Sequence, residues 1–334
     1  MKALVWVANA EMKVENVPEP RPPSGWMVLR VSHTGICGSE VAAYMGLNEL
    51  RKPPLIMGHE FSGTVESTVE GKEWMAGKTV SVNPLVGCGS CRFCVSGLRN
   101  LCAKRKIIGA AFDGSFAELV CVPADSCHVA ASPINGALAE PLATAIRAVD
   151  RCNLSPSDSA VVFGMGIIGL FILKLLKLRR IGNVVAVDTN AQRLRSADIC
   201  GATRAVNMLS KDADGDLLDY AGDGFDFSFD AVGIGATRSR CTDLLRSGGK
   251  SVFVGNHEDI SSIRANTVVR REISIEGSYA YSDHQFENAV HLAQTDFVES
   301  DPVWLAVRRL EDGPSTFSAL ASNSLGQAKI MLKS

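Results

Sequence analysis

Two patterns of hydrophobic and polar residues divide this chain near residue 145. In the first part, short alternating or β-branched runs are separated by Pro and Gly, which is typical of strands joined by turns. The predicted strands are Lys2–Val7, Trp26–His33, Gly63–Val69, Thr79–Val82 and Phe116–Val122. The proline-rich stretch Pro18–Pro23 predicts an extended connector. The first part of the chain is therefore expected to be mostly β.

In the second part, short apolar runs alternate with helix-like stretches. The predicted strands are Ala160–Phe163, Val184–Val187, Phe225–Ala231 and Ser251–Val254. The predicted helices are Ile168–Arg180, Gln192–Ile199 and Ala236–Arg246. This alternation is typical of βαβ units around a parallel sheet that is buried on both faces. In the tail we expect a helix near Phe286–Ala293 and a strand at Ala328–Lys333.

Length and composition narrow the class of protein. Because 334 residues exceed what a single hydrophobic core usually organises, we expect an α/β protein of two domains. Apolar residues make up 46% of the chain and charged residues 21%, as in soluble globular proteins. A net charge of -2 and a pI near 6.3 provide no general attraction to nucleic acids or acidic membranes. The expected partner is a small molecule.

The sequence contains no pattern for membrane insertion or secretion. The longest unbroken apolar run, from Ala160 to Leu173, has 14 residues and is too short to cross a bilayer. The first residues lack the charged, apolar and cleavage regions of a secretory signal. We therefore expect a cytoplasmic protein.

Four closely spaced cysteines predict a metal site. They follow the pattern C-x2-C-x2-C-x7-C, and they are Cys88, Cys91, Cys94 and Cys102. Four thiolates at this spacing can surround Zn²⁺ and leave no open position for a substrate, so we expect structural zinc. An iron–sulfur run would need its fourth cysteine after three residues and then a Pro, but here the gap is seven and Ala103 follows. Disulfides are disfavoured in the cytoplasm, and a nucleic-acid-binding ribbon would need interleaved basic and aromatic residues.

A glycine-rich turn predicts a dinucleotide site. Gly164-Met165-Gly166-Ile167-Ile168-Gly169 follows a predicted strand and opens a predicted helix, and Asp188 ends the next strand. In this fingerprint the glycines permit a tight turn and bring the pyrophosphate to the helix N-terminus. Asp188 would accept the adenosine-ribose hydroxyls and repel the 2′-phosphate of NADP, so NAD is preferred and NADP is less favoured. Arg193 is either an adenine contact or a residue on the helix surface. For the segment as a whole, the alternative is a strand–turn–helix unit that binds no nucleotide.

Three further segments carry candidate metal ligands. Cys37 lies in G-I-C-G-S-E, the pair His59-Glu60 lies in M-G-H-E-F-S-G, and Glu140 lies in A-E-P-L. Taken singly, such a Cys or His is usually structural. Together, they could form an open site with one thiolate, one imidazole and one or two carboxylates, leaving a position for water or substrate.

These motifs, in this order, resemble those of the zinc-containing medium-chain alcohol dehydrogenases nearly end to end. The matching segments are Cys37–Glu40, Gly58–Gly63, the four-cysteine segment, Asp113–Glu118, Ala139–Leu142 and the glycine-rich turn. The A-E-P-L segment is similar to that of the polyol branch, which includes sorbitol, butanediol and galactitol-phosphate dehydrogenases. In that branch Glu replaces the second cysteine ligand of the liver-type enzymes.

The resemblance implies a domain plan and a ligand set. It implies a GroES-like catalytic domain at 1–144 and 284–334, and a Rossmann cofactor domain at 145–283. It implies a catalytic zinc bound by Cys37, His59 and Glu60, with Glu140 as a direct ligand or through water, so that Glu60 and Glu140 can alternate. We therefore expect two zinc ions per chain and, as in similar family members, a homodimer or homotetramer.

The implied reaction is the oxidation of a secondary alcohol to a ketone. Zinc would lower the pKa of the substrate hydroxyl to roughly 7, Ser39 would accept its proton, and hydride would pass to the nicotinamide. Many polyol-branch relatives have a His that carries the proton onward where this chain has Ala42, and Glu40 stands in place of the usual Asp. Tyr44 is close in sequence to this position and is a candidate for lining the pocket.

Two other functions are alternatives, and the sequence leaves open whether the substrate is phosphorylated. A zinc-free, quinone-reductase-like NADPH enzyme would lack Cys37, His59 and the four cysteines, and a non-catalytic nucleotide sensor would have a degenerate metal site. A phosphorylated polyol would require a basic cluster. The candidates for that cluster are Arg147, Arg270 and Arg271, and the segment from Thr267 to Tyr281 is similar to galactitol-phosphate-type enzymes.

Overall fold

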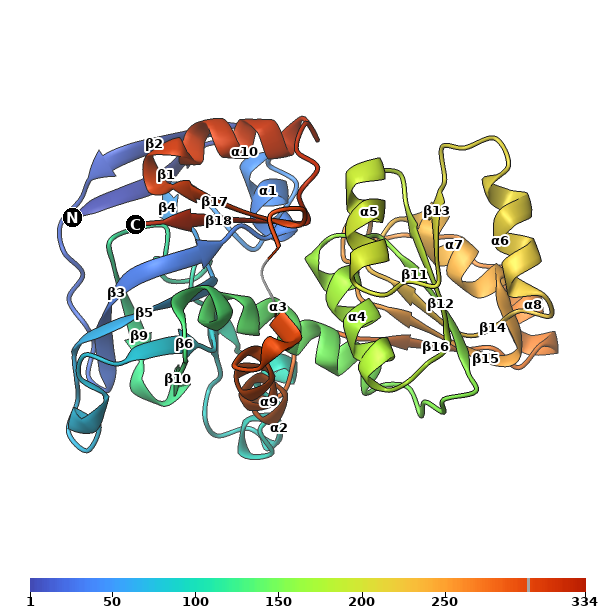
Figure 1. Ribbon diagram of the computed structural model, residues 1–334. Coiled ribbons are helices and arrows are strands. Elements are labelled where there is room, and N and C mark those ends of the chain that lie inside the picture. Colours follow the sequence, from blue (N-terminus) through green and yellow to red (C-terminus); the bar gives the residue numbers. More distant parts are fainter. Residues whose placement is uncertain (299–300) are drawn as a thin grey trace. The chain divides into compact units, whose positions relative to one another are not determined.

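The computed structural model describes residues 1–298 and 301–334, which form two compact units (Figure 1). The first unit contains Met1–Ala143, Tyr281–Leu325 and Lys329–Ser334, and the second contains Thr144–Ala280 and Gly326–Ala328. The chain first passes from one to the other within helix α3 (Pro133–Val149).

A seven-stranded sheet is the centre of the first unit. Its main order is β10-β6-β5-β3-β18-β17, and β9 pairs with β3. The strands are β3 (Trp26–Gly35), β5 (Glu60–Ser67), β6 (Thr79–Val82), β9 (Leu119–Pro123), β10 (Cys127–Val129), β17 (Leu305–Arg309) and β18 (Lys329–Lys333). Because the tail strand β18 pairs antiparallel with β3, with Met331 opposite Gly35, the C-terminal segment lies beside the first predicted metal motif.

Smaller elements complete the first unit. A three-stranded sheet has the order β2-β1-β4, and β7 pairs with β8. These strands are β1 (Lys2–Ala8), β2 (Glu11–Asn16), β4 (Leu55–Ile56), β7 (Leu85–Val86) and β8 (Lys106–Ile107). The helices are α1 (Gly38–Tyr44), α2 (Arg92–Val95), α9 (Asp283–Ala293) and α10 (Gly313–Ala321). Short 3-10 turns are η1 (Glu73–Met75), η2 (Arg99–Leu101), η3 (Ala124–Ser126), η4 (Asp296–Val298) and η5 (Leu310–Asp312).

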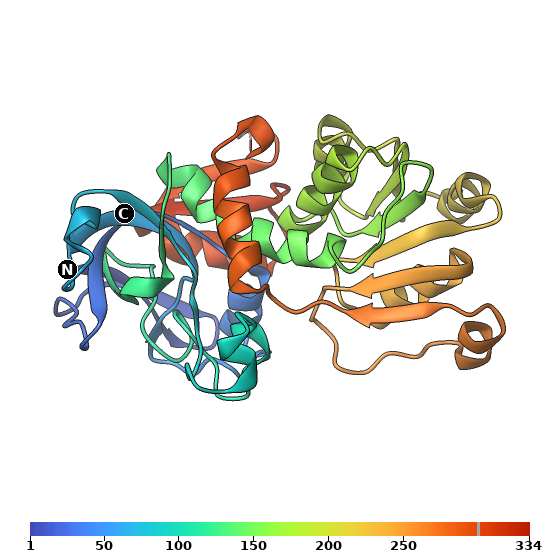
Figure 2. The same cartoon turned by 90° about the horizontal axis from the view of Figure 1, so that it is seen from below.

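The second unit is a six-stranded parallel sheet with the order β13-β12-β11-β14-β15-β16. Its strands are β11 (Ser159–Phe163), β12 (Asn183–Asp188), β13 (Arg204–Asn207), β14 (Phe225–Asp230), β15 (Leu245–Phe253) and β16 (Ser274–Gly277). Its helices are α4 (Ile167–Leu178), α5 (Ala191–Ile199), α6 (Ala213–Ala221), α7 (Gly235–Asp243) and α8 (Ala265–Arg270), and they flank the strands in Figure 2. This order is that of a doubly wound dinucleotide-binding sheet, which confirms the predicted fold class.

Burial explains why the central strand of this sheet is continuously apolar. Ala160, Val161 and Val162 have no exposed surface, because helices cover a parallel sheet on both sides. The predicted helix Ala236–Arg246 is too long at its end, since β15 already begins at Leu245. In the part of the chain that the structure describes, no helix is long and apolar enough to cross a bilayer.

Asp226 joins the first residues of three neighbouring strands. Its carboxylate accepts hydrogen bonds from the amide and the hydroxyl of Ser159 at 2.7 and 2.9 Å, and it pairs with Arg246 Nε at 2.6 Å. Although partial burial opposes ionisation, these contacts lower the pKa of Asp226. The carboxylate therefore stabilises the fold in its charged form.

We expect Asp226→Ala to lower the melting temperature of the protein at neutral pH, because charged hydrogen bonds of this kind contribute about 1–3 kcal/mol. The pKa is depressed in the folded state, so this stabilisation is present above the unfolded pKa of about 3.9 and is lost as the pH falls through the folded value. Differential scanning calorimetry at neutral and acidic pH measures the difference. Asp223→Ala, at an exposed neighbour, is the control. Equal melting temperatures for both variants would contradict the assigned role.

Candidate metal and cofactor sites

The pairing of β3 with β5 brings three candidate ligands together. Gly35, near the end of β3, is opposite Glu60, at the start of β5, and Cys37 follows as the N-cap of α1. The donor atoms of Cys37, His59 and Glu60 lie within 4.8 Å of one another. A Cβ atom at Gly35 would lie 2.3 Å from Glu60 Oε2, so only glycine leaves room for that carboxylate. One thiolate, one imidazole and one carboxylate fit an open zinc site.

Glu40 orients this group, a role that sequence reasoning missed. Its fully buried carboxylate accepts hydrogen bonds from the backbone amides of Cys37 at 3.0 Å and Gly58 at 2.8 Å, and it lies 2.7 Å from His59 Nδ1. With Nδ1 engaged, Nε2 is the imidazole nitrogen left for a metal. Buried Arg51, whose Nη2 is 3.3 Å from the same nitrogen, supplies the balancing charge.

The same contacts affect protonation. Burial opposes the charged forms, yet the ion pair holds the pKa of Glu40 below its usual range and raises the pKa of His59 well above its own. A histidine must be neutral to bind a metal, so metal binding here would release a proton.

Lys329 is a second residue that sequence reasoning missed. It comes from β18, its side chain is 2% exposed, and its ammonium pairs with Glu60 Oε2 and donates to the carbonyl of Ile36 at 2.9 Å. Despite burial, the charges of Glu60 and Cys37 raise the pKa of Lys329. The sequence did contain a signal for a buried charge, a lysine inside an apolar strand of the tail. The residue that it pairs with, Glu60, is 269 residues away, so the pairing could not be predicted.

Glu140 lies outside the three-residue donor group. It is on α3, and its Oε1 accepts a hydrogen bond from Tyr281 Oη at 2.9 Å. Burial and the charge of Glu60 raise the pKa of Glu140 to about 7. That Glu140 binds the metal, directly or through a water, stays a prediction.

The remaining residues near this motif have different environments. Ser39 is partly exposed in the first turn of α1, two residues after Cys37. Tyr44 is only 6% exposed, its hydroxyl donates to the carbonyl of Ala10 at 2.8 Å, and its ring lies against Phe317. Tyr44 is therefore a core residue of the first unit, and its contacts do not support the expectation that it lines the substrate pocket.

The four cysteines form the second donor group. The sulfur atoms of Cys88, Cys91, Cys94 and Cys102 all lie within 4.8 Å of one another. Backbone amides of Ser90 and Cys91 lower the pKa of Cys88 to about 6, whereas burial raises the pKa of Cys94 to about 11. Four sulfur donors and no other ligand type fit a closed zinc site.

The segment that carries these cysteines is attached to helix α9. Arg99 Nε pairs with Asp283 at 2.7 Å, and the backbone amide of Asp283 donates to the carbonyl of Gly97 at 2.8 Å. A metal bound by the four thiolates would therefore also order the start of α9.

The glycine-rich turn has the shape that a pyrophosphate requires. Gly164 has a φ of 90°, and a Cβ at Gly169 would lie 1.8 Å from the carbonyl oxygen of Gly164, so helix α4 can begin this close to the turn only with glycine. A Cβ at Gly166 would meet nothing within 4 Å, which leaves open space above the first amides of α4, those of Ile167 and Ile168.

Asp188 lies directly beneath this turn, at the end of β12. Its Oδ2 accepts a hydrogen bond from the amide of Met165 at 2.6 Å, and its Oδ1 accepts one from the amide of Asn190 at 2.8 Å. Arg193 is in the first turn of α5, where its amide donates to Asn190 Oδ1 and its Nε is buried. Arg193 is thus more enclosed than a free surface arginine.

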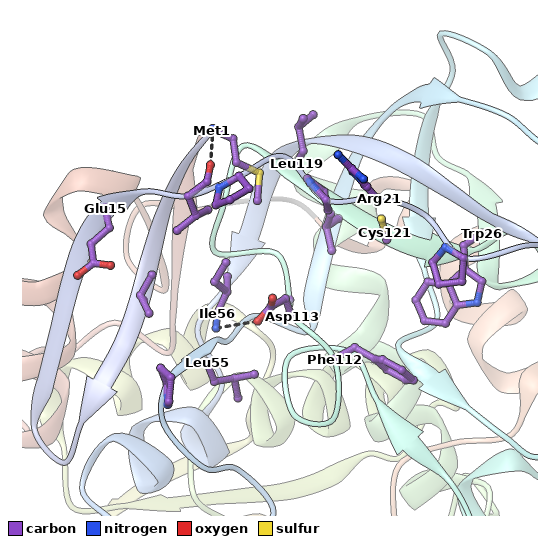
Figure 3. A pocket seen from close by; sticks show the side chains of 18 residues that line it. Met1, Glu15, Arg21, Trp26, Leu55, Ile56, Phe112, Asp113, Leu119 and Cys121 are labelled. Carbon is purple, nitrogen blue, oxygen red and sulfur yellow. Dashed lines mark hydrogen bonds between the residues drawn. The ribbon is translucent and has the colours of Figure 1, made fainter.

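A cavity in the first unit is separate from both donor groups. It has a volume of about 570 Å³ and is lined by the proline-rich connector together with Trp26, Phe112 and Asp113 (Figure 3). None of the predicted site residues is among those that line it.

Comparisons with known proteins agree with these observations. Residues 23–132 match the alcohol dehydrogenase GroES-like domain, and residues 168–295 match the zinc-binding dehydrogenase domain. The chain is 32% identical to L-idonate 5-dehydrogenase of Vitis vinifera, over 76% of this chain and 73% of that protein. It is 30% identical to D-altritol 5-dehydrogenase of Agrobacterium fabrum, over 89% of both. The crystal structure of 2R,3R-butanediol dehydrogenase from Bacillus subtilis is similar over 100% of this chain and 99% of its own chain, with a TM-score of 0.89 and 28% identity.

The chain belongs to the zinc-containing medium-chain alcohol dehydrogenase family. It is an oxidoreductase whose first unit has the GroES-like fold, and its relatives include polyol and diol dehydrogenases. The family resemblance stated from the sequence motifs is confirmed.

We expect two zinc ions in each wild-type chain and one in a Cys37→Ala variant, because this change removes the only thiolate of the open donor group and leaves the four-cysteine group intact. Mass spectrometry of the metal content per chain measures both values. The control is Cys121→Ala, a partly buried thiol outside both groups, which should keep two ions. A Cys37→Ala variant that retained both ions would show that the open site is wrongly assigned.

Proposed function

We propose that this protein oxidises a secondary alcohol group of a polyol, sugar alcohol or diol to a ketone with NAD as hydride acceptor, and runs in reverse when NADH is abundant. The observation that carries the proposal is the donor group of Cys37, His59 and Glu60 in a chain that also has an intact dinucleotide turn. Relatives named as L-idonate, D-altritol, butanediol and sorbitol dehydrogenases support the substrate class.

Zinc would supply Lewis-acid polarisation of the alcohol oxygen, and NAD would accept the hydride. The charges of the surrounding residues favour loss of a proton at that position. Glu40 is balanced by Arg51, and Lys329 cancels one of the two negative charges of Cys37 and Glu60. With a divalent ion bound and Glu140 protonated, these charges leave the site net positive, which lowers the pKa of an alcohol there.

We assign proton transfer to Ser39. Its place in the first turn of α1, two residues after Cys37, and its partial exposure support this assignment. From Ser39 the proton would move toward the nicotinamide ribose. Ala42 offers no group for the further step that a histidine provides in many polyol-branch relatives.

The environment of Asp188 favours NAD over NADP. Its carboxylate accepts hydrogen bonds from two backbone amides that fix its position, so a 2′-phosphate beside it would meet a negative charge. Solved structures of similar proteins contain one cofactor or the other: an alcohol dehydrogenase (rspB) from Escherichia coli CFT073 is complexed with NADH, and a putative zinc-binding dehydrogenase from Sinorhizobium meliloti 1021 is bound to NADP. Each has a TM-score of 0.91, at 25% and 27% identity, and each comparison covers 100% of this chain and 99% of the other.

Two of the three candidate arginines do not support a phosphorylated substrate, and the third, Arg270, is exposed at the end of α8. Arg147 is buried, and Arg271 donates to the backbone carbonyls of Asp243 and Leu245. These two guanidinium groups are therefore not a solvent-facing cluster that could bind a phosphate. A nucleotide sensor without activity is disfavoured by the complete donor group.

A substrate panel tests the proposed reaction. We expect NADH formation with at least one of sorbitol, L-idonate, D-altritol and 2,3-butanediol, measured by absorbance, and its loss after zinc is removed by a chelator. Phosphorylated polyols and 2-propanol complete the panel. If none of these alcohols reduces NAD or NADP, the proposal is wrong.

Replacing Asp188 by Asn tests the cofactor assignment. Asn keeps an oxygen acceptor for one backbone amide and removes the charge, so we expect the ratio of kcat/KM for NADP to that for NAD to rise about tenfold or more. Steady-state kinetics with both cofactors measure it. A wild-type enzyme that prefers NADP would contradict the assigned role of Asp188.

We also propose that the protein is a homodimer or homotetramer. Strand β16 ends the parallel sheet and pairs with β15 on one side only among the described residues, and Ile275 on it is 37% exposed. An edge of this kind is usually covered by another chain or element. Light scattering after gel filtration measures the mass, and a monomer at micromolar concentration would contradict this proposal.

A further inference from the structure

Arg238 connects helix α7 to the loop that follows β15. Its Nη1 donates to the carbonyl of Glu258 at 2.7 Å and to Ser261 Oγ at 2.8 Å, and its Nη2 donates to the carbonyl of Gly255 at 3.2 Å. The side chain is only 12% exposed, and its Nε lies 3.6 Å from the buried carboxylate of Asp230. The guanidinium thus holds the base and the middle of the 254–261 loop with three hydrogen bonds.

A loop residue, Glu258, also attaches the loop to the start of α7. Glu258 Oε2 accepts the amide of Gly235, the first residue of α7, at 2.6 Å, and the amide of Glu258 donates to the carbonyl of Gly233 at 2.8 Å. A Cβ at Gly233 would lie 2.3 Å from the carbonyl carbon of Gly255, so the two backbones touch. In contrast, residues 256–260 are exposed, and Ile260 is 85% exposed. These attachments therefore fix a loop whose outer part faces solvent.

The loop lies at the edge of the sheet where the dinucleotide turn lies. The carboxyl ends of parallel strands share one edge, and ligands of doubly wound sheets bind outside it. The turn after β14 reaches the glycine-rich turn directly, because a Cβ at Gly164 would lie 2.6 Å from the side chain of Val232. Asp188, at the end of β12, marks the adenosine side of β11. The other half of a bound dinucleotide must therefore extend over the ends of β14 and β15, where the 254–261 loop begins.

We propose that Arg238 is a positioning residue for the nicotinamide half of the dinucleotide, because it holds the 254–261 loop in the form that lines this half. The inference rests on the proposed use of NAD. Without the guanidinium, the carbonyls of Gly255 and Glu258 lose their donors, and the loop has to be ordered when the cofactor binds.

Ligands with and without nicotinamide test the proposal. We expect Arg238→Ala to raise the Kd for NADH about tenfold and to leave the Kd for ADP-ribose, which lacks the nicotinamide ring, within about twofold of wild type. Isothermal titration calorimetry measures both. Arg240→Ala is the matched control, since Arg240 is on the same helix but pairs with Asp214 at the surface and should change neither value.

A second measurement does not need the cofactor. In the cofactor-free protein, amides of residues 255–261 should exchange hydrogen faster in Arg238→Ala than in wild type or Arg240→Ala. If Arg238→Ala does not fold, Arg238→Lys serves in both experiments, because one ammonium cannot reach three acceptors in the fork geometry of a guanidinium.

The outcomes separate this proposal from the proposed function. A wild-type protein that binds neither NADH nor ADP-ribose overturns both. If wild type binds NADH and the Arg238 variant binds it equally well, or loses NADH and ADP-ribose to the same extent, only the positioning role is overturned.

Discussion

The metal centre depends on the balance of buried charges around it. Two carboxylates, Glu40 and Glu60, are almost completely enclosed. Glu60 pairs with the buried ammonium of Lys329, and the buried guanidinium of Arg51 lies 3.3 Å from the His59 nitrogen that Glu40 contacts. An ionised group without a partner at such positions would cost several kcal/mol. Because Glu40 bonds to two backbone amides and the imidazole of His59, this balance also fixes the direction of the donor atoms.

Local motifs predicted the parts of the site that are close together in sequence. The four cysteines and the glycine-rich turn each carry their chemistry in a short segment, so spacing alone indicated a metal and a nucleotide. The pair His59-Glu60 indicated a metal only together with Cys37 and Glu140. The doubly wound sheet followed from apolar runs that alternate with helical stretches, since each run is buried on both faces.

Contacts between distant segments could not be predicted in this way. Lys329 reaches Glu60 only because β18 pairs with β3, and nothing in the tail sequence specifies that pairing. Glu40 appeared only as an unusual replacement for Asp, since two of its three contacts reach Gly58 and His59, which are 18 and 19 residues away. Helix α3 was not predicted because Pro141, a residue that normally ends helices, lies inside it. Arg238 had no motif at all.

The two amide contacts of Asp188 have a consequence for redesign of the cofactor preference. The carboxylate that we assign to the ribose hydroxyls also anchors the turn at Met165 and the cap at Asn190. Recognition and local architecture are therefore inseparable at this residue. A chain engineered to accept the phosphorylated dinucleotide has to replace the lost anchors as well as the charge, or the cradle for the pyrophosphate loosens along with the selectivity.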